Sequence, residues 1–172
     1  MKDYVILVDD NDQEVGVLPK MDAHIYGHLH RAFSVFIFNS KGELLLQQRA
    51  FAKYHSGGLW TNTCCSHPQP GELTLDGAKR RLNEEMGVIC SIEEIFEFKY
   101  NIKFSNGLIE HEYDHVFFGS SDNIPICNTE EVASWKYIAV NDLMTDVNDF
   151  PQHYTEWFKM SIKRVLDEIK LK

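Results

Sequence analysis

Residues 71–88 read GELTLDGAKRRLNEEMGV and predict one well-defined helix. Thr74 is the expected N-cap, and Gly87 is a natural stop because glycine readily adopts the left-handed conformation that ends many helices. Ala78 and Leu82 are four residues apart and share the face that would pack on a sheet. The segment also carries many charged side chains: Glu72, Arg80, Arg81, Glu84 and Glu85.

Short apolar runs on both sides of this helix predict strands. Upstream, residues 5–8 and 15–18 form a hairpin pattern, and further strands are expected at 33–38, 44–49 and 59–65. Downstream, 95–104 and 108–118 predict a second hairpin, since Asn106-Gly107 is a strong turn signal. A strand at 135–138, a helix at 140–144 and an amphipathic helix at 154–169 follow. This order predicts an α/β (α+β) fold, a mixed sheet with helices packed on it.

The bulk properties exclude several classes of protein. The chain has 172 residues, 44% of them hydrophobic, which suits a single domain over 1–172. Its net charge of −9 disfavours nucleic acid, which requires a basic face. No run approaches the ~18 apolar residues of a membrane helix, and no signal-peptide core is visible. We expect a cytoplasmic protein with reduced thiols and no nucleic-acid or membrane partner.

Two stretches carry reactive side chains at alternate positions. In TNTCCSHP (61–68), Cys65 and His67 would point the same way on a strand, into one site. In IEHEY (109–113), Glu110 and Glu112 do the same, while His111 should face away. A thiol, an imidazole and two carboxylates are costly to bury without a purpose, so this set indicates metal binding and proton transfer.

A group of histidines adds to this set. His24, His28 and His30 lie close together in DAHIYGHLH (22–30). A single histidine is more often structural than a ligand, but three beside His67 and the Glu-x-Glu strand favour a metal site. Imidazoles and carboxylates together suit Zn²⁺, Mn²⁺ or a similar ion.

The residues from Ser66 to Val88 resemble a degenerate Nudix box. Ser66 stands where that family usually has glycine, and Arg81 where its hydrolases have a metal-binding glutamate. The second departure disfavours hydrolysis and leaves diphosphate binding intact. Further motifs are similar to those of the type I isopentenyl-diphosphate isomerases, a branch of the Nudix superfamily, over about residues 5–157: HRAFSVF (30–36), LQQR (46–49), WTNTCCSHP (60–68) and EHE (110–112).

This resemblance implies a Nudix-like mixed sheet between helices with an additional N-terminal hairpin, and it implies roles for individual residues. Cys65 and Glu112 would be the acid–base pair, Tyr100 would assist Glu112, and Trp157 would face a cationic intermediate. The substrate, an isoprenoid diphosphate, would be bound by Lys20, Arg49, Lys53 and Arg81. Glu85 would hold Mg²⁺ on the diphosphate. One Zn²⁺ or Mn²⁺ (or Mg²⁺) would be held by His24, His30, His67, Glu110 and Glu112. A monomer is expected, with a homodimer as the alternative.

Other interpretations remain open at this stage. The nearest is a Nudix hydrolase acting on a nucleoside or sugar diphosphate, and a more distant one is a non-catalytic module with structural zinc. Structural zinc sites are usually closed and rich in cysteine, which a His/Glu site is not. The helix at 71–88 could simply be a solvated charged face, and Cys65, Tyr100 and Trp157 could be core residues. Lys20 and Lys53 could be ordinary surface lysines.

Overall fold

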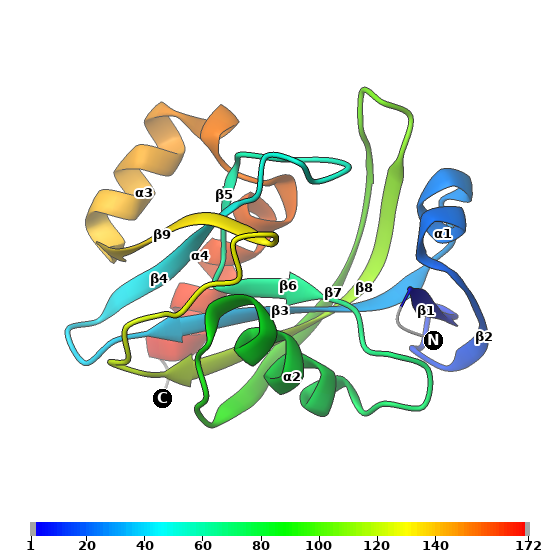
Figure 1. Ribbon diagram of the computed structural model, residues 1–172, viewed down its shortest axis with the longest axis horizontal. Helices are drawn as coiled ribbons and strands as arrows, with labels where there is room; N and C mark the ends of the chain where they lie inside the picture. Colours follow the sequence, from blue (N-terminus) through cyan, green and yellow to red (C-terminus); the bar gives the residue numbers. More distant parts are fainter. Residues whose placement is uncertain (1–2, 171–172) are drawn as a thin grey trace.

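The computed structural model describes residues 3–170, in which nine strands form one mixed sheet with helices on both faces (Figure 1). The first half contains β1 (Tyr4–Val8), β2 (Glu14–Pro19), α1 (Lys20–Tyr26), β3 (His30–Phe38), β4 (Glu43–Arg49), β5 (Trp60–Thr61) and β6 (Cys64–Ser66). The second half contains α2 (Thr74–Met86), β7 (Ile92–Lys103), β8 (Ile109–Ser120), β9 (Val132–Ala139), α3 (Val140–Asp149), the 3-10 helix η1 (Pro151–His153) and α4 (Glu156–Lys170).

Strand β3 is the centre of the sheet. It runs parallel to β8 and antiparallel to β1, β4 and β6. The long β7–β8 hairpin extends the sheet on one side, and β9 and β5 pair with β4 on the other. The β1–β2 pair is the expected N-terminal hairpin. The predicted mixed sheet is therefore confirmed.

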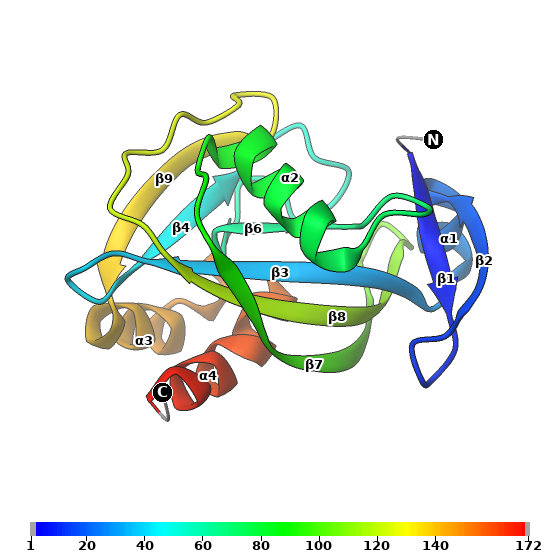
Figure 2. The same ribbon diagram turned by 90° about the horizontal axis from the view of Figure 1, so that it is seen from below.

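Helix α2 covers one face of the sheet, while α3 and α4 lie on the opposite face (Figure 2). Because side chains alternate along a strand, β3 contributes to both layers. Phe33 and Val35 pack with Leu82 of α2, whereas Phe36 packs with Phe158 of α4. The sheet thus lies between two hydrophobic cores.

The expected helix at 71–88 is present with one correction at its start. Leu73 is the N-cap in extended conformation, and Thr74 is already the first helical residue. The predicted stop is confirmed, since Gly87 is left-handed with φ of 63°. A Cβ at Gly87 would also lie 2.6 Å from the Ile126 carbonyl oxygen, so only glycine fits there.

A single strand at 59–65 was the wrong prediction. The segment divides into β5 and β6 because Asn62 and Thr63 use their side chains to bond backbone groups. The Asn62 amide donates to the Cys64 carbonyl at 2.7 Å, and the Thr63 hydroxyl donates to the Leu45 carbonyl at 2.6 Å. His67 consequently lies just beyond the strand that holds Cys65.

Helix α1 and the 3-10 helix η1 were not predicted, and most of the other elements were predicted in kind but not in length. The Asn106-Gly107 turn is confirmed, with Gly107 at φ of 89°. Both arms of its hairpin extend further from the turn than predicted and end one residue earlier beside it. Strand β3 begins three residues before Phe33, at His30, which brings that histidine into the sheet. Helix α3 continues to Asp149. Over residues 3–170, no helix is long and apolar enough to cross a membrane.

Candidate active site and metal centre

One pocket, of about 530 Å³ including space open to solvent, brings most of the predicted site residues together. Side chains from α1, β3, β4, β6, α2, the β7–β8 hairpin and α4 line it. The predicted residues in its wall are Lys20, Arg49, Lys53, Cys65, His67, Arg81, Glu85, Tyr100, Glu110, Glu112 and Trp157. Four further residues, to which the sequence analysis assigned no role in the site, also line it: Ser34, Gln47, Tyr54 and Ser66.

Strand register explains why distant residues meet here. In the parallel β3–β8 pair, His30 lies opposite Glu112, and in the β7–β8 hairpin Tyr100 also lies opposite Glu112. In the β3–β6 pair, Ser34 lies opposite Cys65. Because alternate residues of β8 share a face, Glu110 accompanies Glu112, as the sequence predicts.

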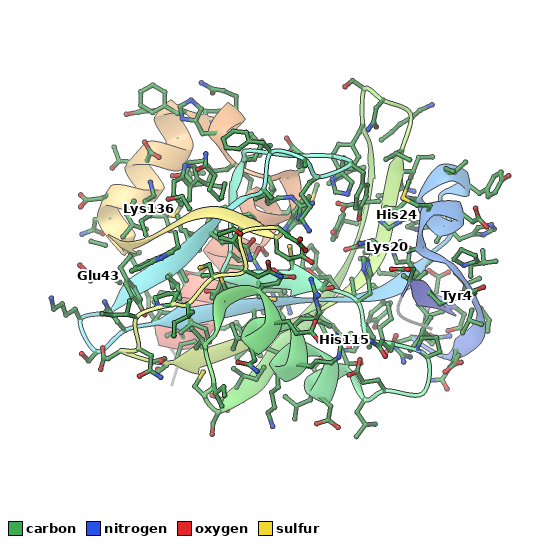
Figure 3. The ribbon with its side chains drawn as sticks, in the orientation of Figure 1. Tyr4, Lys20, His24, Glu43, His115 and Lys136 are labelled. Atoms are coloured by element: carbon green, nitrogen blue, oxygen red, sulfur yellow. The ribbon has the colours of Figure 1, made fainter. Side chains whose placement is uncertain are left out.

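In two histidines, a backbone contact at Nδ1 leaves Nε2 free to bind a metal ion. His24 Nδ1 lies 2.7 Å from the Lys20 carbonyl oxygen, and His30 Nδ1 lies 2.8 Å from the His28 carbonyl oxygen. A carbonyl only accepts, so each Nδ1 carries the proton and each Nε2 presents a lone pair. Both Nε2 atoms are buried without a hydrogen-bond partner. Figure 3 shows Lys20 and His24, both residues of α1, near each other.

These nitrogens converge with two further predicted ligands. The candidate ligand atoms of His24, His30, His67 and Glu112 all lie within 4.8 Å of one another. Burial lowers the pKa of His24 to about 4 and that of His67 to about 3, so both rings are neutral at physiological pH, as ligands must be. Together with the unpartnered nitrogens, this donor set fits a divalent metal ion.

The pKa values of the two buried carboxyl groups, Glu110 and Glu112, are shifted in opposite directions. Burial and the neighbouring Glu112 raise the pKa of Glu110 well above its usual range. Burial also disfavours ionised Glu112, but the adjacent His30 and His67 imidazoles outweigh it and hold the Glu112 pKa well below its usual range. The Tyr100 hydroxyl donates to Glu112 and, at 3.4 Å, to Glu110. Glu112 is thus the ionised member of the pair.

Cys65 and Cys64 have different surroundings. Cys65 lines the pocket, and Arg49 Nη1 lies 3.8 Å from its Sγ atom. Burial raises the pKa of Cys65 to about 12 despite the nearby guanidinium, so the thiol keeps its proton at neutral pH. Cys64 is fully buried in the core beneath α2.

The four predicted cations lie around the pocket with acidic neighbours. Arg81 Nη2 donates to Glu85 at 2.6 Å and to Glu131 at 3.0 Å. Lys53 also pairs with Glu131. Gln47 donates to the second Glu85 oxygen at 2.9 Å, so this predicted Mg²⁺ ligand is already oriented.

The Arg49 guanidinium lies over the Trp157 ring, 5.2 Å from its centroid. The Trp157 side chain is buried and belongs to the α4 core as well as to the pocket wall. Lys20 Nζ lies 4.8 Å from the centre of the Tyr54 ring. The cationic side of the pocket is therefore built partly on aromatic rings.

His28 and His111, which the resemblance leaves out of the metal site, lie apart from the candidate ligands. His28 is exposed, and His111 Nδ1 contacts the Gly27 carbonyl oxygen at 3.0 Å on the other face of β8.

Sequence reasoning missed His55, which is buried with Nε2 2.9 Å from a Glu110 oxygen. It also missed Asp114, which accepts a hydrogen bond from Ser34 at 2.8 Å. Alternation beyond Glu112 could have revealed Asp114.

Fold and site together define a Nudix-domain protein. The NUDIX domain model matches residues 28–158, the greater part of the chain. A protein of Deinococcus radiodurans has a similar solved structure, with a TM-score of 0.72 and 20% identity over 86% of this chain and 90% of that one. At that identity the likeness establishes the fold alone.

Curated relatives narrow the family. The chain is 52% identical to isopentenyl-diphosphate Delta-isomerase 2 of Aromatoleum aromaticum, over 96% of this chain and 88% of that protein. It is 51% identical to isopentenyl-diphosphate Delta-isomerase of Pectobacterium atrosepticum, over 95% of this chain and 91% of that protein. The chain belongs to the isopentenyl-diphosphate Delta-isomerase family of Nudix proteins.

Proposed function

We propose that this protein interconverts isopentenyl diphosphate and dimethylallyl diphosphate, a step that supplies isoprenoid precursors. The observation that carries the proposal is the lining of one pocket by a protonated thiol, Cys65, and an ionised buried carboxylate, Glu112. The names of relatives at about 50% identity support the same reaction.

The reaction requires an acid, a base and a site that tolerates a cation. An unactivated alkene gains a proton at its terminal carbon and becomes a tertiary carbocation. A proton then leaves the neighbouring carbon on the diphosphate side, and the double bond forms there. Hydrolysis of a diphosphate has no need of a buried thiol, so the Cys65–Glu112 pair favours isomerisation over a Nudix hydrolase.

In this proposal Cys65 and Glu112 act on opposite faces of the substrate, one giving a proton and the other removing one. Positioned proton donors and acceptors of this kind typically contribute 10²–10⁴-fold to rate. Tyr100 holds Glu112 through its hydroxyl and can pass a proton to it. Because the reaction is reversible, the two groups exchange roles between the forward and reverse directions.

Trp157 protects the cationic intermediate. A ring face beside a carbocation contributes about 0.5–2 kcal/mol of cation–π attraction, and a buried ring excludes water that would trap the cation. Arg49 already lies near one side of this ring, which supports an electrostatic role for it. The same ring packs in the α4 core, so its position is fixed before substrate arrives.

The diphosphate binds through Lys20, Arg49, Lys53 and Arg81. Arginine suits phosphate oxygens because its planar fork can make two parallel hydrogen bonds. Glu85 would hold Mg²⁺ on the diphosphate, in keeping with the one or two protein carboxylates that this ion usually takes. Binding energy from the diphosphate is available to orient the alkene between the acid and the base.

The metal centre consists of His24, His30, His67, Glu110 and Glu112, and its ion is Zn²⁺ or Mn²⁺, with Mg²⁺ as the alternative. When bound, the ion supplies positive charge that keeps Glu112 ionised and fixes its orientation. The chain's own contribution is the hydrogen bonding of the second ring nitrogens of His24 and His30, which sets their tautomers.

The proposal extends to the state of the protein. Residues 1–172 act as a single catalytic domain, and the enzyme is a cytoplasmic monomer that needs neither nucleic acid nor a membrane. Gel filtration of the active enzyme at micromolar concentration tests the oligomeric state. A homodimer peak that carries the activity would contradict the monomer.

The reaction itself is tested by NMR. The metallated protein is incubated with isopentenyl diphosphate and Mg²⁺ in D₂O, and the product is dimethylallyl diphosphate with solvent deuterium in its new methyl group. Unchanged substrate in the presence of folded, metallated protein overturns the proposal. Phosphate or nucleotide release from nucleoside diphosphates, measured in parallel, detects the alternative hydrolase.

A further inference from the structure

Among residues 3–170, three histidines have a buried Nε2 atom without a hydrogen-bond partner: His24, His30 and His55. A buried polar atom with no partner is destabilising and rare, so each one requires an explanation. For His24 and His30 the explanation is the proposed metal ligation. His55 lies outside every motif that identified those ligands, yet it has the same property.

The surroundings of His55 Nε2 are those of a ligand. It lies 2.9 Å from Glu110 Oε1 but is not hydrogen-bonded to it, so this contact leaves the nitrogen unsatisfied. The candidate ligand atoms of His24, His55 and Glu110 all lie within 4.8 Å of one another. The ring nitrogens of His24 and His55 and a carboxylate oxygen of Glu110 are thus close enough together to bind one metal ion.

The His55 ring is held firmly in this position. It stacks on Phe104, with ring centroids 4.5 Å apart and planes 13° apart, and it meets the edge of Trp157 at 5.9 Å. Its Nδ1 atom lies 3.2 Å from the Ser56 hydroxyl. The imidazole is therefore fixed on two sides and by one nitrogen, and the other nitrogen is aimed at the carboxylates.

The backbone after His55 is shaped to keep it there. Ser56 adopts a left-handed conformation with φ of 52°. A Cβ at Gly57 would lie 2.6 Å from the Phe51 carbonyl oxygen, so the loop closes on itself only with glycine at this position. The Arg49 guanidinium also donates to the His55 carbonyl at 3.3 Å. The loop conformation thus holds His55 against Arg49, one of the residues predicted to bind the diphosphate.

We propose that His55 is a fourth imidazole ligand of the metal centre. This inference rests on the metal centre of the proposed function and adds a ligand to it. Both groups of candidate ligand atoms contain His24, and one imidazole nitrogen binds one ion at a time, so the proposal assigns both groups to a single centre. Four imidazoles favour a borderline divalent cation such as Zn²⁺ or Co²⁺ over Mg²⁺, which prefers oxygen ligands.

Co²⁺ titration of the metal-free, full-length protein tests this inference without reference to turnover. The visible absorption bands of Co²⁺ report its ligands, and the titration gives its affinity. His55→Phe keeps the stacking on Phe104 and removes the nitrogens. We expect it to weaken Co²⁺ binding by about tenfold or more and to shift the bands, with Mg²⁺ affinity changed little. Wild-type affinity and bands in this variant overturn the proposal.

Two further variants distinguish direct metal ligation by His55 from an indirect effect through Glu110. His55→Gln can hydrogen-bond Glu110 but is a poor ligand for Co²⁺, so we expect it to behave like His55→Phe. If it retains the wild-type affinity and spectrum, His55 acts through Glu110 and the proposal is overturned. His55→Gln also carries the test if circular dichroism shows that His55→Phe is unfolded. His111→Ala, a half-buried neighbour, should leave binding unchanged.

His24→Ala tests the metal centre itself. Loss of Co²⁺ binding in His24→Ala together with unchanged binding in both His55 variants overturns only the role of His55. Unchanged binding in His24→Ala overturns the metal centre of the proposed function and the His55 inference with it. Weakened binding and shifted bands in both His24 and His55 variants support the four-imidazole centre.

Discussion

Cys64 and Cys65 are consecutive residues of β6 and lie on opposite faces of the sheet. Cys64 is fully buried beneath α2, whereas Cys65 lines the pocket beside Arg49. The same thiol chemistry thus occurs once in a core and once in the candidate active site. Substitution of Cys64 is therefore a control for substitution of Cys65.

Cys65→Ala is expected to abolish isomerisation or to reduce kcat by about 10²–10⁴-fold, because it removes one of the two groups that we propose transfer protons. Cys64→Ala should leave kcat near the wild-type value and lower the free energy of unfolding by about 1 kcal/mol. Steady-state kinetics and urea denaturation of both variants measure these effects. Equal loss of activity in the two variants would contradict the assignment of Cys65.

Glu112→Gln preserves the shape of the side chain and removes its ionisable group. We expect a fall in kcat of about 10²–10⁴-fold, since a neutral amide cannot accept the proton. Glu94→Gln, an exposed glutamate of the same hairpin, is the control and should be fully active. Normal turnover by Glu112→Gln, measured with the NMR assay, would falsify the acid–base assignment.

Tyr100→Phe removes only the hydroxyl that donates to Glu112. Because the carboxylate loses a partner that orients it, we expect kcat to fall about 10–100-fold while KM changes little. Tyr113 offers a matched control, since its hydroxyl donates to Glu97 at 2.7 Å, away from the pocket. A rise in KM without a change in kcat would indicate that Tyr100 binds substrate instead.

The parts of the site that could be predicted are those set by local geometry. Two-residue alternation placed Glu110 and Glu112 on one face of β8 and His111 on the other. The Asn-Gly signal located the β7–β8 turn, and glycine located the end of α2. These features depend on neighbouring residues, so a single sequence contains them.

The parts that could not be predicted depend on the folded chain. His55 lies in a loop without periodicity, and only tertiary packing against Phe104 brings its ring to Glu110. Glu131 is far in sequence from Lys53 and Arg81, and the fold alone pairs them. Likewise, the break between β5 and β6 depends on side-chain bonds from Asn62 and Thr63 to the backbone of other strands, at Val35 and Leu45.

Arg81→Gln should weaken binding of the diphosphate. Loss of a charge-assisted hydrogen bond costs about 1.5–3 kcal/mol, which corresponds to a rise in KM of roughly 10–100-fold. Arg80→Gln is the neighbouring control, because Arg80 is held by Glu72 through bonds of 2.7 and 2.8 Å. It should change stability by less than about 1 kcal/mol and leave KM unaltered. Similar KM values for both variants would exclude a specific role for Arg81.

Glu131 should make the stability of the protein depend on acid pH. Burial disfavours its charged form, but Lys53 and Arg81 outweigh this and lower its pKa from 4.5 to about 2. The ionised carboxylate therefore stabilises the folded state fully above about pH 4.5, and this contribution disappears as pH falls towards 2. After allowance for solvent screening, the contribution is about 1–2 kcal/mol.

Urea denaturation of the wild type and Glu131→Gln from pH 2 to 7 tests this dependence. The difference in unfolding free energy between them should be largest near neutral pH and shrink through the window between pH 4.5 and 2, because protonated glutamate and glutamine are both uncharged. Glu130→Gln, at an exposed adjacent position, should follow the wild type at every pH. A pH-independent difference between wild type and Glu131→Gln would mean that Glu131 stabilises the fold by packing and not by its ion pairs.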